Sequence, residues 1–146
     1  MSISTVLFVC TGNTCRSPLA EGIAQKWLDE NGFSDWLAVS AGVFASEGCS
    51  ASEETIKALS QRGITFSGTS KCITKKMATS ATAILCMSRS HLAAVNQFVD
   101  NAELLDPPGD ILDPIGQDQS VYDALAKQMD ILISTKLTLL TNKGSK

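Results

Sequence analysis

The chain has 146 residues, a formal net charge of −3 and an apolar fraction of 44%. This length suits one domain with a sizeable hydrophobic core, so we expect residues 1–146 to form a single domain. The acidic charge balance gives no reason to expect nucleic acid or an anionic membrane as a partner. No apolar run approaches the length needed to cross a bilayer, and the first residues lack the basic start of a signal peptide.

The cysteine pattern indicates a reducing compartment, and we therefore expect a cytoplasmic protein. The five cysteines are odd in number and irregular in spacing, unlike a secreted disulfide framework. They are Cys10, Cys15, Cys49, Cys72 and Cys86. His91 is the only histidine, which excludes zinc motifs with two histidines, and the first two cysteines are not at zinc-ligand spacing. We expect neither a metal nor another cofactor.

The first half of the chain begins with a strand, a helix and a second strand. Residues 6–9 form a short apolar run that is typical of a buried strand. From residue 17 to 28, apolar residues repeat at helical spacing, with Pro18 just inside the start. Residues 36–41 then predict a second strand that ends at Gly42.

A second helix is predicted after residues 50–53, which have the form of a capping box. We expect this helix to run to about Arg62 and to stop at Gly63. Its expected core side consists of Ala51, Ile56 and Leu59. The following stretch, residues 65–80, is polar and predicts only a short helix.

The third strand is predicted at residues 82–87, and Ser88 or Ser90 can cap the helix after it. The expected core face of that helix consists of Leu92, Val95, Phe98 and Val99. Residues 102–105 predict a short fourth strand. The alternation of strands and helices predicts an α/β fold, a four-stranded parallel sheet with helices on both faces.

The last third of the chain predicts one long loop and one helix. Residues 106–116 are too rich in Pro and Gly for regular structure. Apolar residues from Ser120 to about Thr141 repeat at helical spacing, and residues 142–146 are expected to be a frayed tail.

The segment from Cys10 to Ser17 is the strongest functional signal in the chain. A loop between a strand and a helix directs its N–H groups and the positive end of the helix dipole toward one point. We expect Cys10 to be a thiolate there, and the Arg16 guanidinium fits two oxygens of a phosphate. The combination predicts phosphoryl transfer through a cysteinyl-phosphate. Alternatively, Cys10 merely ends a strand and Arg16 is a surface charge, but Gly12 and Asn13 inside the loop favour function.

We expect this loop to bind phosphate through its backbone and Arg16. The expected set is Thr11, Gly12, Asn13, Thr14, Cys15, Arg16 and Ser17. Ser17 is expected to hydrogen-bond the Cys10 sulfur, and Asn13 to hold the shape of the loop. Cys15 is either a small filler or a resolving thiol that closes a reversible disulfide with Cys10.

The general acid is expected from the loop that follows the fourth strand. Loops at the carboxyl ends of parallel strands lie on one rim of the sheet, so this loop can meet Cys10. Asp113 is the candidate, because Pro114 stiffens the chain beside it. Asp106 and Asp110 compete on composition alone, and an Asp-Pro pair is also a common turn opener.

The run from Val6 to Pro18 resembles the signature of the low-molecular-weight protein tyrosine phosphatase family. Residues 40–42 and 113–114 match two further landmarks of that family in the expected order. The resemblance covers essentially the whole chain. It implies a four-stranded parallel sheet flanked by helices and a metal-free mechanism. It also implies Cys10 as nucleophile, Arg16 as phosphate clamp and Asp113 as general acid.

Two departures from the tyrosine-specific pattern concern the substrate. Those members usually carry an aliphatic residue at Thr14 and aromatic residues after the Asp-Pro, where this chain has Ile115 and Gly116. The bacterial protein-arginine phosphatases of the family resemble the chain more closely at Thr14 and at residues 40–46, but they usually have an aromatic residue at the position of Ile115. We therefore expect phosphoarginine in proteins as the substrate, with phosphotyrosine as the alternative. Separately, we expect the enzyme to be a monomer.

Two other functions remain as alternatives. Related thiol-dependent arsenate reductases use a similar loop with two further cysteines near the third strand. Cys86 lies in that region, but no cysteine follows it. A phosphate-binding regulator without turnover is the second alternative, and the intact Cys10, Arg16 and Asp113 argue against it.

Overall fold

The computed structural model describes residues 3–107 and 109–144 and contains one parallel sheet. The strands are β1 (Ser4–Cys10), β2 (Trp36–Gly42), β3 (Ala83–Cys86) and β4 (Ala102–Leu104). Their order in the sheet is β2-β1-β3-β4, with every neighbouring pair parallel. The predicted α/β class is thereby confirmed.

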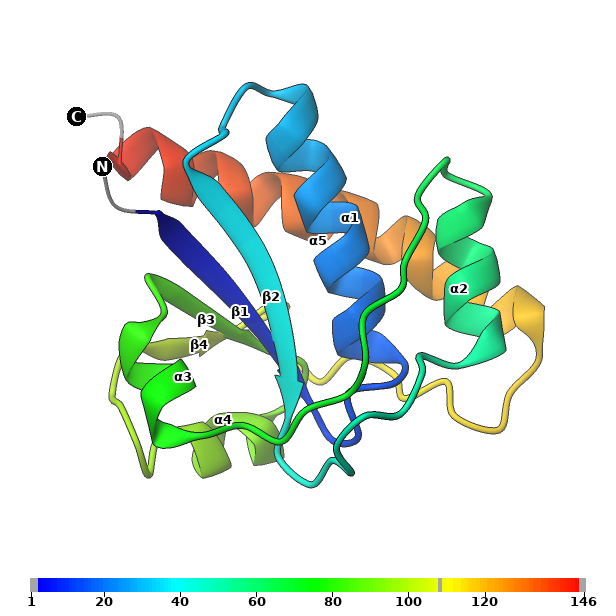
Figure 1. The fold of residues 1–146 in the computed structure, drawn as a ribbon, viewed down its shortest axis with the longest axis horizontal. Helices are drawn as coiled ribbons and strands as arrows, with labels where there is room; N and C mark the ends of the chain where they lie inside the picture. Colours follow the sequence, from blue (N-terminus) through cyan, green and yellow to red (C-terminus); the bar gives the residue numbers. More distant parts are fainter. Residues whose placement is uncertain (1–2, 108, 145–146) are drawn as a thin grey trace.

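Helices cover both faces of this sheet, as Figure 1 shows. They are α1 (Arg16–Glu30), α2 (Glu53–Ser60), α3 (Lys75–Ser80), α4 (Arg89–Val95) and α5 (Gln119–Gly144). The first, second and fifth helices pack on one face, and the third and fourth on the other.

The central strand β1 is buried on both faces, which explains its unbroken apolar run. Val6 and Phe8 belong to the core beneath α1 and α5, whereas Leu7 and Val9 belong to the core beneath α3 and α4. All four side chains are fully buried. The strand thus holds Cys10, its last residue, on a rigid support.

The structure corrects the register of α2. Ser52, not Ser50, caps this helix, and its hydroxyl accepts a hydrogen bond from the Thr55 backbone N at 3.2 Å. The buried face therefore consists of Thr55, Ala58 and Leu59, and the prediction that Ile56 faces the core is wrong, since it is 37% exposed. The Ser52 N–H donates to the Thr14 carbonyl, so a contact with the Cys10 loop selects the cap.

Two helix ends also differ from the sequence prediction. The fourth helix is capped by Ser88 and ends at Val95, so Phe98 and Val99 lie beyond it, although both still pack on the core. The fifth helix continues to Gly144, so the predicted frayed tail is helical up to that residue, and 145–146 lie outside the described residues.

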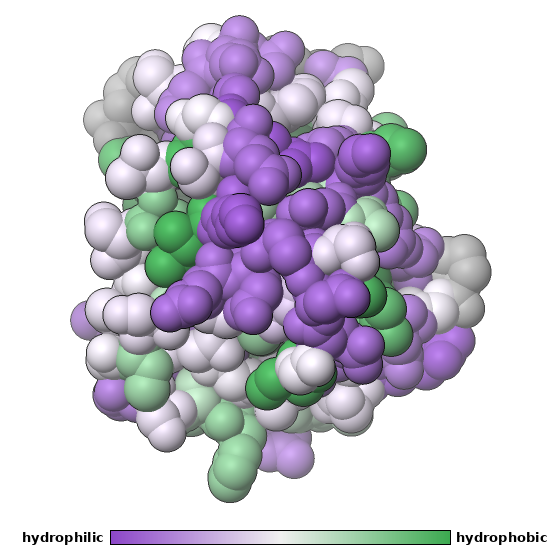
Figure 2. All heavy atoms as spheres, turned by 90° about the vertical axis from the view of Figure 1, so that its right-hand side faces the viewer, coloured by the Kyte–Doolittle hydropathy of each residue, from purple (hydrophilic) through white to green (hydrophobic). Residues whose placement is uncertain are grey.

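Within the described residues, no helix is both long enough and apolar enough to span a membrane. The face that carries α2 and the start of α5 is mainly hydrophilic, with scattered hydrophobic residues (Figure 2). Scattered apolar residues are ordinary on a protein surface and do not form a contiguous interaction patch on this face.

Candidate active site

The Cys10 loop joins the carboxyl end of β1 to the first residue of α1, Arg16. Backbone bonds tie it to the segment after β2, because the Val43 and Phe44 N–H groups donate to the carbonyls of Cys10 and Thr11. Gly42 permits this approach. A Cβ there would lie 3.0 Å from the Asn13 nitrogen and closer still to the Thr11 carbonyl oxygen.

Asn13 holds the centre of the loop in a left-handed conformation, with φ of 58°. Its side-chain amide donates to Ser17 Oγ at 2.8 Å and to Ser40 Oγ at 2.9 Å. Its side-chain oxygen accepts from the Lys71 backbone N at 2.9 Å. Ser17 at the start of α1 and two segments distant in sequence, at Ser40 and Lys71, thus hold this one residue in place.

The Cys10 sulfur lies 2.9 Å from the Ser17 hydroxyl oxygen, and both side chains are buried. That oxygen accepts from Asn13, and the Ser17 proton has two acceptors within reach, the Cys10 sulfur at 2.9 Å and the Ala41 carbonyl at 3.4 Å. A hydroxyl donor at this position stabilises a negative charge on Cys10. The predicted contact between Ser17 and Cys10 is confirmed.

Arg16 connects the Cys10 loop to the late loop. Its side chain is 7% exposed. Its Nη1 donates to the Ile111 carbonyl at 3.1 Å, and its Nη2 donates to Thr11 Oγ1 at 3.4 Å. The same Nη2 lies 3.4 Å from Asp113 Oδ2. The guanidinium is therefore held from two loops that are about a hundred residues apart in sequence.

Of the three candidate acids, the structure brings Asp113 to the site. Its carboxyl is 45% exposed, pairs with Arg16, and accepts the Ile115 N–H at 3.2 Å. Asp110 instead accepts the Arg89 backbone N–H at 2.9 Å, at the start of α4.

A cavity of about 130 Å³ joins these groups. It is lined by Cys10, Thr11, Gly12, Thr14, Cys15, Arg16, Asp113 and Ile115. Most of the predicted phosphate-binding residues thus face one space, whereas Asn13 and Ser17 support it from behind. In the part of the chain that the structure describes, no three His, Cys, Asp or Glu side chains form a group that could hold a metal.

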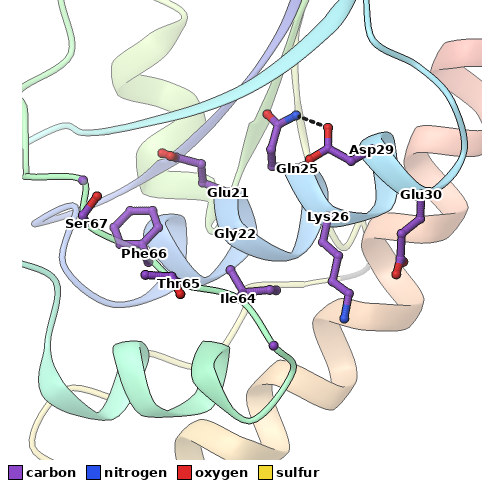
Figure 3. A pocket seen from close by; sticks show the side chains of 12 residues that line it. Glu21, Gly22, Gln25, Lys26, Asp29, Glu30, Ile64, Thr65, Phe66 and Ser67 are labelled. Carbon is purple, nitrogen blue, oxygen red and sulfur yellow. Dashed lines mark hydrogen bonds between the residues drawn. The ribbon is translucent and has the colours of Figure 1, made fainter.

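A larger cavity of about 450 Å³ lies elsewhere, between α1 and residues 63–68. Figure 3 shows Glu21, Gln25 and Asp29 along one wall, with Phe66 opposite. Burial raises the pKa of Glu21, although the hydrogen bond from Ser40 and the charge of Lys71 oppose the shift. This cavity shares no residue with the Cys10 pocket.

The remaining buried thiols differ in their surroundings. Cys15 Sγ lies 3.3 Å from the Tyr122 hydroxyl, and burial raises the pKa of Tyr122 to about 12. Cys86, the thiol considered for an arsenate relay, is fully buried in β3, and burial raises its pKa to about 12. A protonated, inaccessible thiol is a poor relay nucleophile, which argues against that alternative.

Sequence reasoning missed three side chains that support the loop. Ser40 accepts from Asn13 and donates to Glu21 at 2.6 Å. His91 lies 2.8 Å from Thr11 Oγ1, and Tyr122 contacts Cys15. His91 and Tyr122 are each the only residue of their type in the chain, but nothing local to them in sequence indicates these contacts.

Comparisons with known proteins agree with this geometry. The family model described as "Low molecular weight phosphotyrosine protein phosphatase" matches residues 5–143. A protein-arginine-phosphatase of Bacillus subtilis is 30% identical over 137 residues, covering 88% of this chain and 91% of the relative. The protein-tyrosine-phosphatase PtpB of Staphylococcus haemolyticus is 34% identical over 135 residues, covering 88% and 94%. A solved YwlE arginine phosphatase mutant with a phosphorylated active-site serine superimposes with a TM-score of 0.88 at 30% identity, covering 94% of this chain and 95% of that one.

Proposed function

Because the chain belongs to the low molecular weight phosphotyrosine protein phosphatase family, it is a protein phosphatase, and we propose that it hydrolyses phosphoarginine through a phosphocysteine on Cys10. The observation that supports phosphoarginine as the substrate is that Thr14, a residue with a hydroxyl group, lines the Cys10 pocket. The likeness to protein-arginine-phosphatases supports it.

In the first step, Cys10 Sγ attacks phosphorus, an S–P bond forms and the P–N bond to the arginine side chain breaks. Asp113 donates a proton to the departing nitrogen. Arg16 and the loop N–H groups stabilise the equatorial oxygens, on which the transition state carries its charge. The bound phosphate replaces the Asp113 carboxylate as the partner of Arg16. The Asp113 carboxyl can then contact the leaving group.

In the second step, water attacks phosphorus and the S–P bond breaks. Asp113, now a carboxylate, takes a proton from the water, and inorganic phosphate forms. The Ser17 hydroxyl, 2.9 Å from the sulfur, stabilises the departing thiolate. Asp113 therefore acts as the acid in the first half-reaction and as the base in the second.

Thr14 and Ile115 favour a guanidinium over a phenol as the leaving group. A threonine hydroxyl can accept a hydrogen bond from a guanidinium N–H, which an aliphatic side chain cannot do. Ile115 lines the pocket and is 66% exposed, and it offers no aromatic face for a phenol ring.

Phosphotyrosine is the second candidate, and Phe44 is the observation that favours it. Its backbone N–H bonds the Thr11 carbonyl, so the residue lies beside the loop, and its side chain is 85% exposed. An exposed aromatic ring there can stack on a phenol.

Peptides of one sequence, phosphorylated either on arginine or on tyrosine, separate these candidates. We expect the higher kcat/KM for phosphoarginine. Thr14→Val keeps the shape of the side chain without its hydroxyl, and should lower kcat/KM for phosphoarginine about tenfold while leaving phosphotyrosine nearly unchanged. A clear preference of the wild type for phosphotyrosine would overturn the proposed substrate.

We further propose that this unit is a single domain, supported by one sheet that carries both core clusters. We propose that it acts as a monomer on phosphorylated proteins in the cytoplasm. Light scattering of the purified protein tests the monomer, and a dimer mass would contradict it.

A further inference from the structure

His91, the only histidine of the chain, lies in the first turn of α4 and is 2% exposed. Its Nε2 lies 2.8 Å from Thr11 Oγ1 in the Cys10 loop, and its Nδ1 lies 2.9 Å from Ser88 Oγ. The imidazole therefore bridges the cap of α4 and a residue that lines the catalytic pocket.

The surrounding groups suit an imidazole that carries its proton on Nδ1. In this tautomer the Thr11 hydroxyl accepts from Arg16 Nη2 and donates its own proton to His91 Nε2. The His91 proton then sits on Nδ1 and is donated to Ser88 Oγ, whose proton goes to Ser90 Oγ at 2.9 Å. In this arrangement each of these donors has one acceptor.

The Thr11 hydroxyl is thus shared between His91 and Arg16. Its bond to His91 fixes the rotation of the hydroxyl and turns an oxygen lone pair toward Arg16. We propose that His91 is a positioning residue for the phosphate clamp, which orients Arg16 through Thr11. This inference rests on the proposed roles of Cys10 and Arg16.

A purely structural role of His91 would be to pack α4 against its cap. The bond between His91 Nδ1 and Ser88 Oγ is sufficient for that role. The two roles use different ring nitrogens. An asparagine side chain in place of the imidazole reaches about as far from the backbone as Nδ1, whereas a glutamine side chain reaches about as far as Nε2. His91→Asn therefore keeps the Ser88 contact and loses Thr11, and His91→Gln keeps the Thr11 contact and loses Ser88.

Turnover of p-nitrophenyl phosphate by these two variants tests the proposal. We expect His91→Asn to lower kcat roughly three- to tenfold, with a smaller change in KM, because the clamp acts most strongly in the transition state. His91→Gln should keep kcat within about twofold of the wild type. Val95→Ala is the control, because it leaves a cavity at a fully buried residue of the same helix. We expect this variant to have a lower urea midpoint and an unchanged kcat.

Equal kcat in the two amide variants would overturn the proposal, as would a kcat loss in Val95→Ala that matches its loss of stability. Thr11→Val combined with His91→Asn should lose no more kcat than the larger single effect, and independent losses would also contradict it. Nitrogen-15 NMR of the single imidazole in the wild type needs no variant, and a proton on Nε2 would refute the assignment. Cys10→Ser tests the proposed function separately, because the loss of activity expected of that variant does not depend on which hydrogen bond His91 makes.

Discussion

Lowering the pH from 7 to 5 is expected to reduce the free energy of unfolding by about 2 kcal/mol through His91 alone. Burial, and after it the Arg16 cation, lowers the pKa of His91 from 6.5 to about 4, and Asp110 and Asp113 oppose the shift. The unfolded chain takes up this proton below pH 6.5, whereas the folded protein does not until about pH 4. Stability from this group is therefore complete above pH 6.5 and is lost as the pH falls.

The full shift, from 6.5 to about 4, corresponds to roughly 3 kcal/mol, most of which is lost by pH 5. This is a large part of the roughly 5–15 kcal/mol that stabilises an ordinary domain. Urea unfolding of the wild type and of His91→Gln at several pH values isolates the effect, since all other titrating groups are common to both.

We expect the wild type to lose about 2 kcal/mol more than His91→Gln between pH 7 and pH 5. Because the chain has one histidine, its imidazole resonances also report the protonation directly. A His91 titration midpoint near 6.5, or parallel pH dependence in the two proteins, would refute the reasoning.

Three further predictions concern the acid, the loop and the cavity beside α1. Asp113→Asn should lower kcat about a hundredfold or more on phenyl phosphate but less on p-nitrophenyl phosphate, whose leaving group needs no proton, and equal losses would argue against a general acid. Gly42→Ala places a Cβ against the Thr11 carbonyl and should lower the free energy of unfolding by about 1–3 kcal/mol and remove most activity. Gly109→Ala, whose Cβ would meet no atom within 4 Å, is the control. Equal stability of the two variants in thermal unfolding would contradict the contact. Burial raises the pKa of Glu21 above 4.5, so unfolding free energy should fall as pH rises from 4.5 through the folded pKa. Glu21→Gln should abolish that fall, and an unchanged profile in urea unfolding would contradict it.

The first strand and the loop after it could be predicted because their signals are local. An apolar run buried on both faces, followed by Gly12, Asn13 and a helix start, specifies a strand-to-helix loop without distant contacts. The carboxyl-end rule for parallel sheets then placed the late loop near Cys10. That rule could not choose among the three acids, since the choice depends on the pairing of Arg16 with Asp113.

The sequence predictions are wrong or incomplete where contacts between segments distant in sequence determine the structure. Two serines compete to cap α2, and the bond between the Ser52 N–H and the Thr14 carbonyl is invisible in the local pattern. With the cap at Ser52, the buried face of α2 consists of Thr55, Ala58 and Leu59, and Ile56 lies outside it. His91 and Thr11 likewise meet only because α4 follows β3, the neighbour of β1 in the sheet.

The central claim is that Cys10 carries the phosphoryl group during turnover. Rapid acid quenching of the enzyme during hydrolysis of p-nitrophenyl phosphate, followed by mass spectrometry of its peptides, tests this directly. We expect one added phosphoryl mass on the peptide containing Cys10, and neither adduct nor turnover in Cys10→Ala. A phosphoryl group on any other residue, or turnover that persists in Cys10→Ala, would contradict it.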